Sequence, residues 1–481
     1  MPNMNAQYSA KPQFEGEYFI PPVPIPNPRA TADYRWYHGL LSIRKIANNP
    51  LESFNFEQFE NPVTQYALFT QAFSVINDPE IIKHCFVDNR NNYKFQELRQ
   101  RVLRAVIGDG LISAEGPKWK HARRAMSPMF TPASVKNFAN VMKDTTEREL
   151  PDLFNTSEAM EIAEPMATLT YLVLSDTLFS GEIKRDRGAI LKDVSTALTY
   201  VGRPDPLDLL NAPEWLPRLS RLKGLKAVKN LRGMIGDLIQ ERKTRLQAGR
   251  ELPDDFLSQL LSVEDANTEP FSNVDIEDHV LAFIGAGHET TARALSWLFY
   301  LLSNDKKSRD RLESEVDNLD LVNTPTEKWV DHLPFAMACF EETMRLFPPA
   351  PFIIRRAIED DVCKGISIKA KSTLFLNTWL LHRHKTLWDK PDAFIPERFL
   401  GEARNTISRF QYLPFGVGER VCIGQRFAMQ EAAILITLLA RNYRFEYAGT
   451  KPAWPKLRIT IQPENGMPMH ITKRRCKSLE N

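Results

Sequence analysis

The segment from Phe415 to Gly424, with the sequence FGVGERVCIG, contains the residue types that point most directly to chemistry. Cys422 lies in it, shortly before an apolar run over residues 425–441 that predicts a helix. A cysteine at a helix N-terminus meets free backbone N–H groups and the positive end of the helix dipole, which lower the pKa of its thiol. The glycines of the segment permit a tight turn around a flat ligand. We therefore expect Cys422 to persist as a thiolate beside such a ligand.

The other four cysteines, Cys85, Cys339, Cys363 and Cys476, are spread widely along the chain. No Cys-x-x-Cys pair occurs, and the total of five is odd, so neither a zinc ribbon nor a disulfide framework is expected. Five thiols in 481 residues are typical of a reducing compartment. Each of the four is expected to be a small buried hydrophobe or an idle surface thiol.

A second cluster of reactive side chains, Ala-Gly-His-Glu-Thr-Thr, ends at Thr291. Glu289 and Thr290 in this cluster can hold and pass protons. Two structural alternatives compete with that role. The threonines can bond back to carbonyls one turn earlier, and Glu289 can pair with Arg293 at position i+4.

The stretch from 272 to 303 must position this cluster, because its apolar spacing predicts one long buried helix with Ser272 or Asn273 as the cap. Gly285 and Gly287 lie in its middle and each cost about 1 kcal/mol relative to alanine. A close approach of another group to the helix backbone would offset that cost.

Apolar residues at helical spacing also predict long helices over 135–154 and 222–248. Short strands are expected at 69–76, 352–357, 366–376 and 457–471. The fold class is therefore mainly α with small β-sheets, an α+β arrangement. Residues 1–30 form an extended lead-in because the proline-rich stretch 21–28 cannot be helical, and residues 31–481 form a single domain.

The 62 Lys and Arg residues nearly balance the 60 Asp and Glu residues, so no global field favours nucleic acid as a partner. The first twenty residues contain Lys11, Glu15 and Glu17 and build no apolar run. We therefore expect no signal peptide, no membrane anchor and a cytoplasmic location.

The pattern Phe-x-x-Gly-x-Arg-x-Cys-x-Gly over 415–424 resembles the haem-binding signature of the cytochrome P450 family. The resemblance implies a haem-thiolate monooxygenase that inserts one oxygen atom of O2 into a hydrophobic organic substrate. Haem b would lie between the long distal helix and the proximal cysteine loop, with Cys422 as the axial iron ligand. Phe415, Arg420 and Gly424 would contact the cofactor.

Further motifs follow in the order and at the separations of that family. Glu342-x-x-Arg345 and the Arg398 of Pro-Glu-Arg-Phe would form a buried ion network that fixes the cysteine loop. Trp119 and Arg123 match Trp-x-x-x-Arg and would hold a haem propionate.

Arg355, ten residues after Arg345, is expected to make another propionate contact, although its neighbour Arg356 is an alternative. For these arginines a solvated surface is the competing interpretation, and for Trp119 it is core packing.

The Ala-Gly-His-Glu-Thr-Thr string resembles the distal pattern of the family, which implies that Glu289 and Thr290 deliver protons during oxygen activation. His288 is expected to be a buried, hydrogen-bonded histidine. An apolar pocket is expected above the haem, suited to a fatty acid, alkane, terpenoid, steroid or aromatic compound, with core packing as the alternative for each residue. The pocket candidates are Phe283, Ala286, Ala350, Phe352, Ile353, Ile354 and Met467.

The resemblance implies a monomer that receives NAD(P)H electrons through a separate ferredoxin or flavodoxin with its reductase. Lys118, Lys120, Arg124 and Arg426 would form a basic docking rim, or else an ordinary solvated face. Two other functions remain open: a peroxide-driven or isomerising haem-thiolate enzyme, and a non-catalytic haem carrier or gas sensor.

Overall fold

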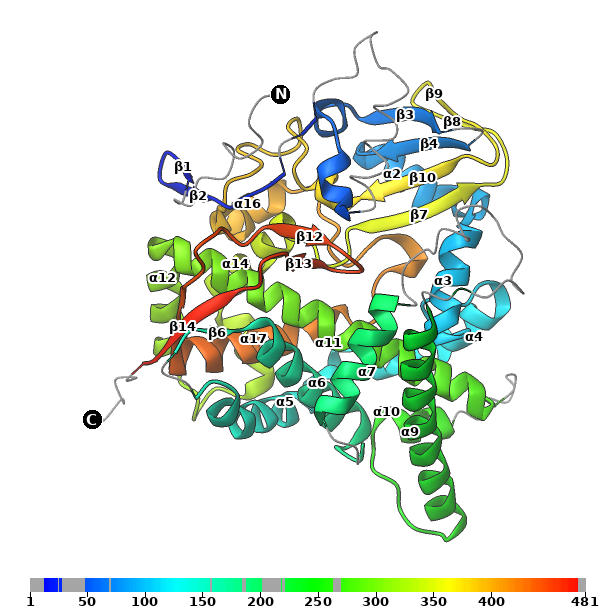
Figure 1. Cartoon of the computed structure of the whole chain (residues 1–481), viewed down its shortest axis with the longest axis vertical. Coiled ribbons are helices and arrows are strands. Elements are labelled where there is room, and N and C mark those ends of the chain that lie inside the picture. Colours follow the sequence, from blue (N-terminus) through cyan, green and yellow to red (C-terminus); the bar gives the residue numbers. More distant parts are fainter. Residues whose placement is uncertain are drawn as a thin grey trace.

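A computed structural model describes residues 13–24, 26–27, 48–68, 71–155, 158–183, 187–200, 218, 221–262 and 270–474. Most of this part of the chain is helical, and helix α11 crosses its middle (Figure 1). The helices are α2 Pro79–Lys83, α3 Glu97–Ile107, α4 Gly116–Met126, α5 Pro132–Leu153, α6 Ala163–Phe179, α7 Arg187–Tyr200, α9 Leu222–Gln247, α10 Phe256–Leu261, α11 Asn273–Asn304, α12 Lys306–Asn318, α13 Trp329–His332, α14 Pro334–Leu346, α15 Thr378–Leu381, α16 Gly401–Thr406 and α17 Gln425–Asn442.

The three long helices predicted from apolar spacing are present as α5, α9 and α11, and the predicted helix after the cysteine loop is α17. Helix α11 begins at a capping box, in which the Ser272 side chain accepts the Asp275 N–H and the Asp275 carboxylate accepts the Ser272 N–H. The cap fixes where the helix starts, and therefore which of its residues face the site.

The strands are short and form small sheets, in agreement with the predicted fold class. They are β1 Gln13–Glu15, β2 Tyr18–Ile20, β3 Val63–Leu68, β4 Gln71–Ile76, β5 Tyr93–Phe95, β6 Met160–Glu161, β7 Phe352–Ala357, β8 Asp361–Cys363, β9 Ile366–Ile368, β10 Thr373–Asn377, β11 Tyr443–Tyr447, β12 Pro455–Leu457, β13 Ile461–Pro463 and β14 Pro468–Lys473.

The largest sheet has the strand order β3-β4-β10-β7-β5. Only β4 and β10 are parallel in it, and the other neighbours are antiparallel. Its register places Arg355 of β7 opposite Leu374 on one side and Phe95 on the other. The sheet thus brings residues about 260 positions apart in the sequence into direct contact, and it does so next to the cysteine loop.

Two of the predicted strands are wrong in extent. The run predicted over 366–376 is interrupted, because Lys371 adopts a positive φ of 66° between β9 and β10. The run predicted over 457–471 is divided among β12, β13 and β14, with Gly466 at a φ of 74°. Residues 69 and 70 of the first predicted strand lie outside the described residues. Apolar alternation locates strand-forming segments but does not reveal left-handed turns inside them.

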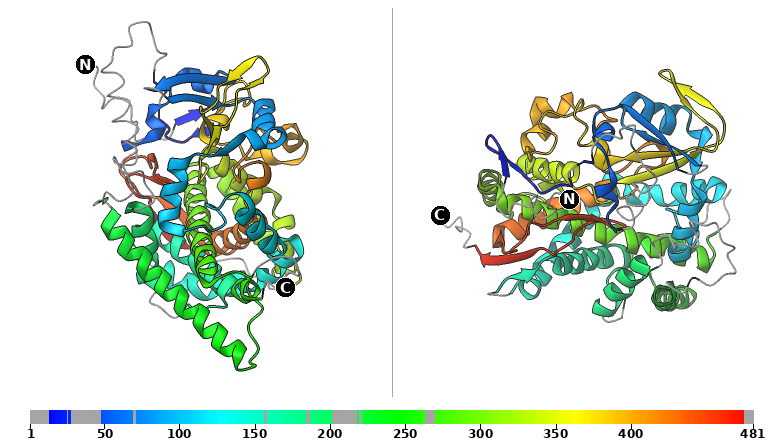
Figure 2. Two further views of the ribbon diagram at one scale, coloured as in Figure 1. Left: turned by 90° about the vertical axis from the view of Figure 1, so that its right-hand side faces the viewer. Right: turned by 45° about the horizontal axis from the view of Figure 1, so that its top comes forward.

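One large apolar core joins α5, α6, α11, α14 and α17, and a smaller one lies against the five-stranded sheet. At Gly287 a Cβ atom would stand 2.8 Å from Leu174 Cδ1, so this glycine permits the close approach of α6 to α11 that the sequence suggested. The same expectation is wrong for Gly285, where no described atom lies within 4 Å of such a Cβ. Helix α9 runs along the outside of the molecule (Figure 2). None of the helices described is long and apolar enough to cross a bilayer.

Candidate active site

The cysteine loop lies directly before α17, as predicted, and a short 3-10 helix, Gly418–Arg420, precedes Cys422. The Cys422 N–H donates to the Phe415 carbonyl over 2.9 Å, which closes the loop. Gly418 has a φ of 72°, and a Cβ atom there would stand 2.3 Å from the Phe86 carbonyl oxygen. Glycine is therefore required at this position both for its backbone angle and for space.

The pKa of the Cys422 thiol departs from the expectation. Burial raises it above its usual value, while the Gly424 N–H and the Arg123 guanidinium act in the opposite direction. Burial therefore has the largest influence on the pKa of this thiol, and the Gly424 N–H and Arg123 offset only part of it. A positive ion bound to the sulfur would compensate the cost of burying the charge and remove the proton.

Trp119 and Arg123 of α4 meet the cysteine loop, and Arg420 within the loop lies against Trp119. The Arg123 Nη1 atom donates to the Val421 carbonyl over 3.0 Å, and the Arg420 guanidinium lies 4.0 Å from the centre of the Trp119 ring. Trp119 and Arg123 therefore share one face of α4 and both meet the cysteine loop. Arg420 donates to the Ala114 carbonyl rather than to a carboxylate, and burial lowers its pKa to about 10.

Of the two neighbouring arginines, Arg355 turns inward and Arg356 outward. Arg355 is buried, with its guanidinium 4.3 Å from the Phe95 ring centre. Arg356 forms an ion pair with Glu97 over 3.1 Å at the surface. The geometry favours Arg355 as the residue that reaches a buried anionic group.

Glu342, Arg345 and Arg398 are brought together as expected. The Glu342 carboxylate accepts two hydrogen bonds from Arg345, at 2.6 and 2.7 Å, and Arg398 Nε lies 3.5 Å from it. The remaining Arg345 donors reach three backbone carbonyls, those of His382, Pro391 and Ala393. This buried ion pair is therefore satisfied on the arginine side, which offsets its desolvation.

His382 connects that network to the cysteine loop, and sequence reasoning missed it. Its carbonyl accepts from Arg345, while its ring Nε2 atom accepts the N–H of Leu413 over 2.9 Å. Burial and the nearby Arg345 and Arg383 lower the pKa of this imidazole well below its usual value. The signal in the sequence was a histidine directly after the apolar pair Leu380-Leu381, but one histidine beside apolar residues is not specific.

On the distal helix α11, Thr290 and Thr291 adopt the competing geometry. The Thr290 hydroxyl donates to the Ala286 carbonyl over 2.8 Å, and Thr291 contacts the Gly287 carbonyl over 3.4 Å. The Thr290 oxygen keeps lone pairs that can accept a further hydrogen bond. His288 is buried with its Nδ1 atom 2.6 Å from the Ile284 carbonyl, as expected.

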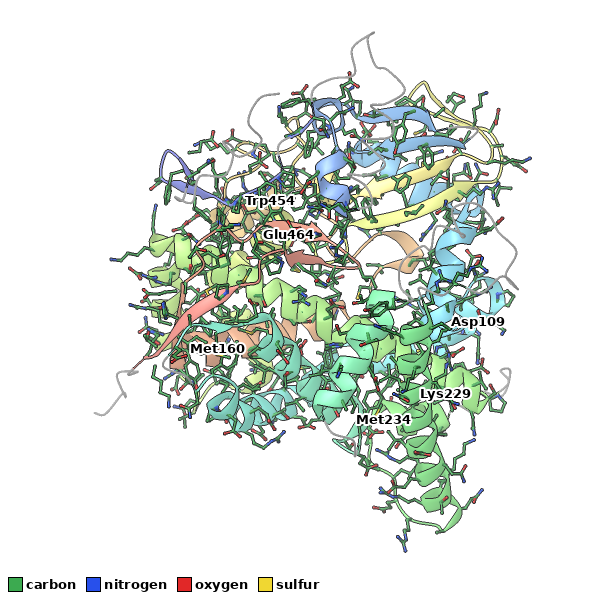
Figure 3. All side chains as sticks on the ribbon, viewed as in Figure 1. Asp109, Met160, Lys229, Met234, Trp454 and Glu464 are labelled. Atoms are coloured by element: carbon green, nitrogen blue, oxygen red, sulfur yellow. The ribbon has the colours of Figure 1, made fainter. Side chains whose placement is uncertain are left out.

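Glu289 turns toward the β12–β13 hairpin. Trp454 and Glu464, which flank this hairpin in the sequence, are labelled in Figure 3. Its Oε1 atom accepts from the Thr460 hydroxyl over 2.9 Å and the Gln462 amide over 3.2 Å. Arg293 lies 3.6 Å from the same oxygen, so the i+4 pair anticipated as an alternative is present. A cavity of about 650 Å³ opens beside Glu289, and Arg293 and Gln462 also line it.

The seven pocket candidates differ in exposure. Ala286 and Ala350 are exposed, and Phe352, Ile353 and Ile354 are partly exposed.

The two remaining candidates are held by packing. The Phe283 ring is stacked on Phe130 at 5.2 Å between centroids and lies 4.4 Å from Phe256. Met467 is fully buried in the main core, so the structure favours core packing for this residue.

The donor set and the open surfaces fit a flat, anionic cofactor. Burial governs the pKa of Cys422, yet the residue has an exposed surface, and Ala286 is likewise exposed although it lies in the middle of the long central helix α11. Both therefore keep a surface that no described protein atom covers. A soft sulfur ligand with nearby buried guanidiniums suits an iron porphyrin with its carboxylates.

The family model for cytochrome P450 matches residues 32–468. The chain belongs to the cytochrome P450 family. It is 28% identical to cyclooctatin synthase of Streptomyces melanosporofaciens, covering 90% of this chain and 93% of the relative. Human cytochrome P450 4X1 is 29% identical over 84% of this chain and 82% of its own.

The fold also matches a solved structure. The crystal structure of the cytochrome P450DA heme domain superposes with a TM-score of 0.78 at 23% identity, covering 94% of this chain and 98% of that one. The P450 fold expected from the cysteine motif is confirmed. Members of this family are haem b monooxygenases that act on hydrophobic substrates with NAD(P)H electrons supplied through redox partners.

Proposed function

We propose that this P450 hydroxylates an apolar substrate and that Cys422 would bind the iron of its haem. The observation that carries the proposal is the place of Cys422, which lies in the loop before α17, keeps an exposed surface and has the Arg123 guanidinium nearby. In balanced form, substrate C–H, O2, two electrons and two protons give the alcohol and water. Bound haem supplies the activation of oxygen, and the protein supplies position, protons and the exclusion of water.

We assign the propionates to Trp119, Arg123, Arg355 and Arg420. The three arginines come from α4, β7 and the cysteine loop, and all are buried or partly buried. Arg123 and Arg420 contact the cysteine loop or Trp119, and Arg355 lines the same cavity as Trp119 and Arg420. Guanidiniums bind carboxylates through charge-assisted hydrogen bonds and keep their charge when partly desolvated. We also assign two further residues of the cysteine loop, Phe415 and Gly424, to cofactor contact. The ion network of Glu342, Arg345 and Arg398 would stabilise this loop.

Glu289 and Thr290 are assigned to proton delivery. Glu289 borders a cavity and can exchange protons with water in it, while Thr290 stands one position further along α11 with lone pairs free to accept. The hairpin contacts of Glu289 hold its carboxylate away from Thr290, so a transfer requires that carboxylate to turn or a water to bridge.

An apolar substrate, of the fatty acid, alkane, terpenoid, steroid or aromatic class, is supported by the exposed Ala286 and Ala350 and the partly exposed segment 352–354. The relatives include proteins named cyclooctatin synthase and carotene epsilon-monooxygenase, and carotene is a hydrocarbon. Phe283 enters the pocket only if it leaves its aromatic stack.

Electrons would come from a ferredoxin or flavodoxin. Lys118, Lys120, Arg124 and Arg426 are all exposed and come from α4 and α17, the helices on either side of the cysteine loop, which suits an acidic partner. We further propose a monomer, a single domain over residues 31–481 and a cytoplasmic location.

Two experiments test the proposal. The reduced carbon monoxide complex of the purified protein should show the red-shifted Soret band of thiolate ligation, and Cys422→Ala should abolish it. An unshifted band in the wild type would contradict the thiolate. With a supplied redox partner, Thr290→Val should divert NAD(P)H oxidation from product to peroxide or water, whereas Thr290→Ser should stay coupled.

A further inference from the structure

Four side chains from four elements form one continuous stack beside the cysteine loop. The ring of Phe95, at the end of β5, lies 4.3 Å from the guanidinium carbon of Arg355 and 4.7 Å from that of Arg420. Arg420 in turn lies 4.0 Å from the Trp119 ring. The order is therefore Arg355, Phe95, Arg420, Trp119, and one phenylalanine joins two cations.

Backbone interactions hold Phe95 next to both arginines. Phe95 pairs with Arg355 in the register of β5 and β7, and its N–H donates to the Glu115 carboxylate over 3.0 Å. Glu115 directly precedes α4, which carries Trp119, and Arg420 donates to the Ala114 carbonyl. The ring at position 95 thus has little freedom to move away from either guanidinium.

Two guanidiniums of like charge repel each other, and the repulsion grows as they leave water. An aromatic face attracts a cation by about 0.5–2 kcal/mol, and the attraction is greater where the cation is desolvated. A ring that contacts both cations therefore compensates part of their desolvation and keeps them a fixed distance apart. An aliphatic side chain of the same size would fill the space but supply no such attraction.

A cavity of about 550 Å³ borders the stack, and Phe95, Trp119, Arg355 and Arg420 all line it. Lys94 and Lys120 line it as well. Both guanidiniums already border this cavity on one side. Loss of the ring would open the side that faces Phe95 as well, and each guanidinium would be free to turn toward solvent or toward an exposed carboxylate such as Glu419.

We propose that Phe95 is a positioning residue of the haem site, whose ring sets the spacing of Arg355 and Arg420, two of the three arginines assigned to the propionates. The inference rests on the proposed function, since it takes Arg355 and Arg420 to be propionate ligands. It adds a residue that carries no charge, belongs to no haem-binding motif and acts only through its two neighbours.

The test compares Phe95→Leu with Phe95→Tyr in the haem-loaded protein. Haem transfer to excess apomyoglobin should be about tenfold faster for the leucine variant, as expected for the loss of two weak cation–π contacts, and unchanged for tyrosine. The reduction potential of the leucine variant should become more negative, because less firmly neutralised propionates favour ferric iron. A denaturant titration of both variants records any general loss of stability.

Phe335→Leu is the matched control. Phe335 lies at the start of α14, and the Arg311 guanidinium lies 3.8 Å from the centre of its ring. Phe335→Leu should leave haem transfer and potential unchanged. If it accelerates haem transfer as much as Phe95→Leu does, the effect is general destabilisation and the proposal is overturned. Wild-type haem transfer and potential in Phe95→Leu would overturn it as well.

A double-mutant cycle tests the same proposal without relying on the folding of Phe95→Leu. Phe95→Met and Arg420→Lys are combined, and the two changes should be strongly non-additive in haem transfer, because each removes the same stack. Additive effects would contradict the coupling. If the wild-type protein lacks the thiolate carbon monoxide spectrum, the proposed function fails; if that spectrum is normal and the cycle is additive, only the role of Phe95 fails.

Discussion

The ring Nε2 atom of His382 accepts the backbone N–H of Leu413 over 2.9 Å, and the carbonyl of the same histidine accepts from Arg345 over 2.7 Å. One residue thereby connects the Glu342–Arg345 ion pair to the segment that leads into the cysteine loop. The ion pair stabilises the loop through this connection and makes no direct contact with the sulfur in the part of the chain described.

Replacing His382 with leucine should weaken this connection. The Leu413 N–H loses its acceptor, and an unsatisfied buried donor costs about 1–3 kcal/mol. His382→Gln, which keeps an acceptor oxygen, should recover part of that loss. Urea unfolding monitored by circular dichroism measures the change, and His332→Leu, at an exposed position, serves as the control. Equal stability of His382→Leu and wild type would show that the bond contributes nothing.

Arg345→Lys should be severely destabilising. A lysine makes at most three hydrogen bonds and cannot form the bidentate pair with Glu342, which is left partly unpaired at 0% exposure. Loss of one partner of a buried pair costs about 3–5 kcal/mol. Arg404→Lys is the control, since Arg404 is 39% exposed and its pair with Glu341 is partly solvated, so this change should cost less than the change at the fully buried pair. The denaturant midpoints of the two variants should differ clearly.

Gly418→Ala should disrupt the cysteine loop. The substitution meets two obstacles, a φ of 72° and the Phe86 carbonyl oxygen at 2.3 Å from the new Cβ atom. Gly365→Ala separates them, because Gly365 has a φ of 77° but no atom within 4 Å of such a Cβ. We expect a modest loss of thermal stability for Gly365→Ala and a much larger one, with poor haem retention, for Gly418→Ala. Similar melting temperatures would mean that the Phe86 backbone yields easily.

Glu431 on α17 should make stability depend on pH. Both its carboxyl oxygens are buried without a well-formed hydrogen bond among the described residues, and burial raises its pKa to about 8, although the Thr291 hydroxyl acts in the opposite direction. A carboxyl with a raised folded-state pKa costs nothing below its unfolded value of 4.5. Above that pH the folded state becomes less stable by about 1.4 kcal/mol per unit, until the cost levels off near pH 8.

Glu431→Gln removes the titrating group and should therefore raise the melting temperature at pH 8 more than at pH 5. Glu341→Gln is the comparison, because its carboxyl has the Arg404 guanidinium as a partner that opposes the rise in its pKa. A Glu431→Gln effect that is the same at both pH values would show that this carboxyl is already ionised or hydrated in the folded protein.

The sequence by itself determined the elements that local patterns encode. Apolar spacing located α5, α9, α11 and α17, and the string around Cys422 indicated the family. These inferences succeed because helix periodicity, capping and a ligand loop before a helix depend on residues close together in the chain.

Only the tertiary structure decided which side chains meet and at what cost. The pKa of Cys422 rises rather than falls because burial outweighs the helix terminus, and burial is a property of the whole fold. Likewise the register of β7 decided that Arg355 is buried, whereas Arg356 lies at the surface. The fold also buries Met467 in the core and brings Glu289 to a hairpin about 170 residues away in the sequence. His382 and Phe95 act through partners distant in sequence, and no local pattern encodes such a contact.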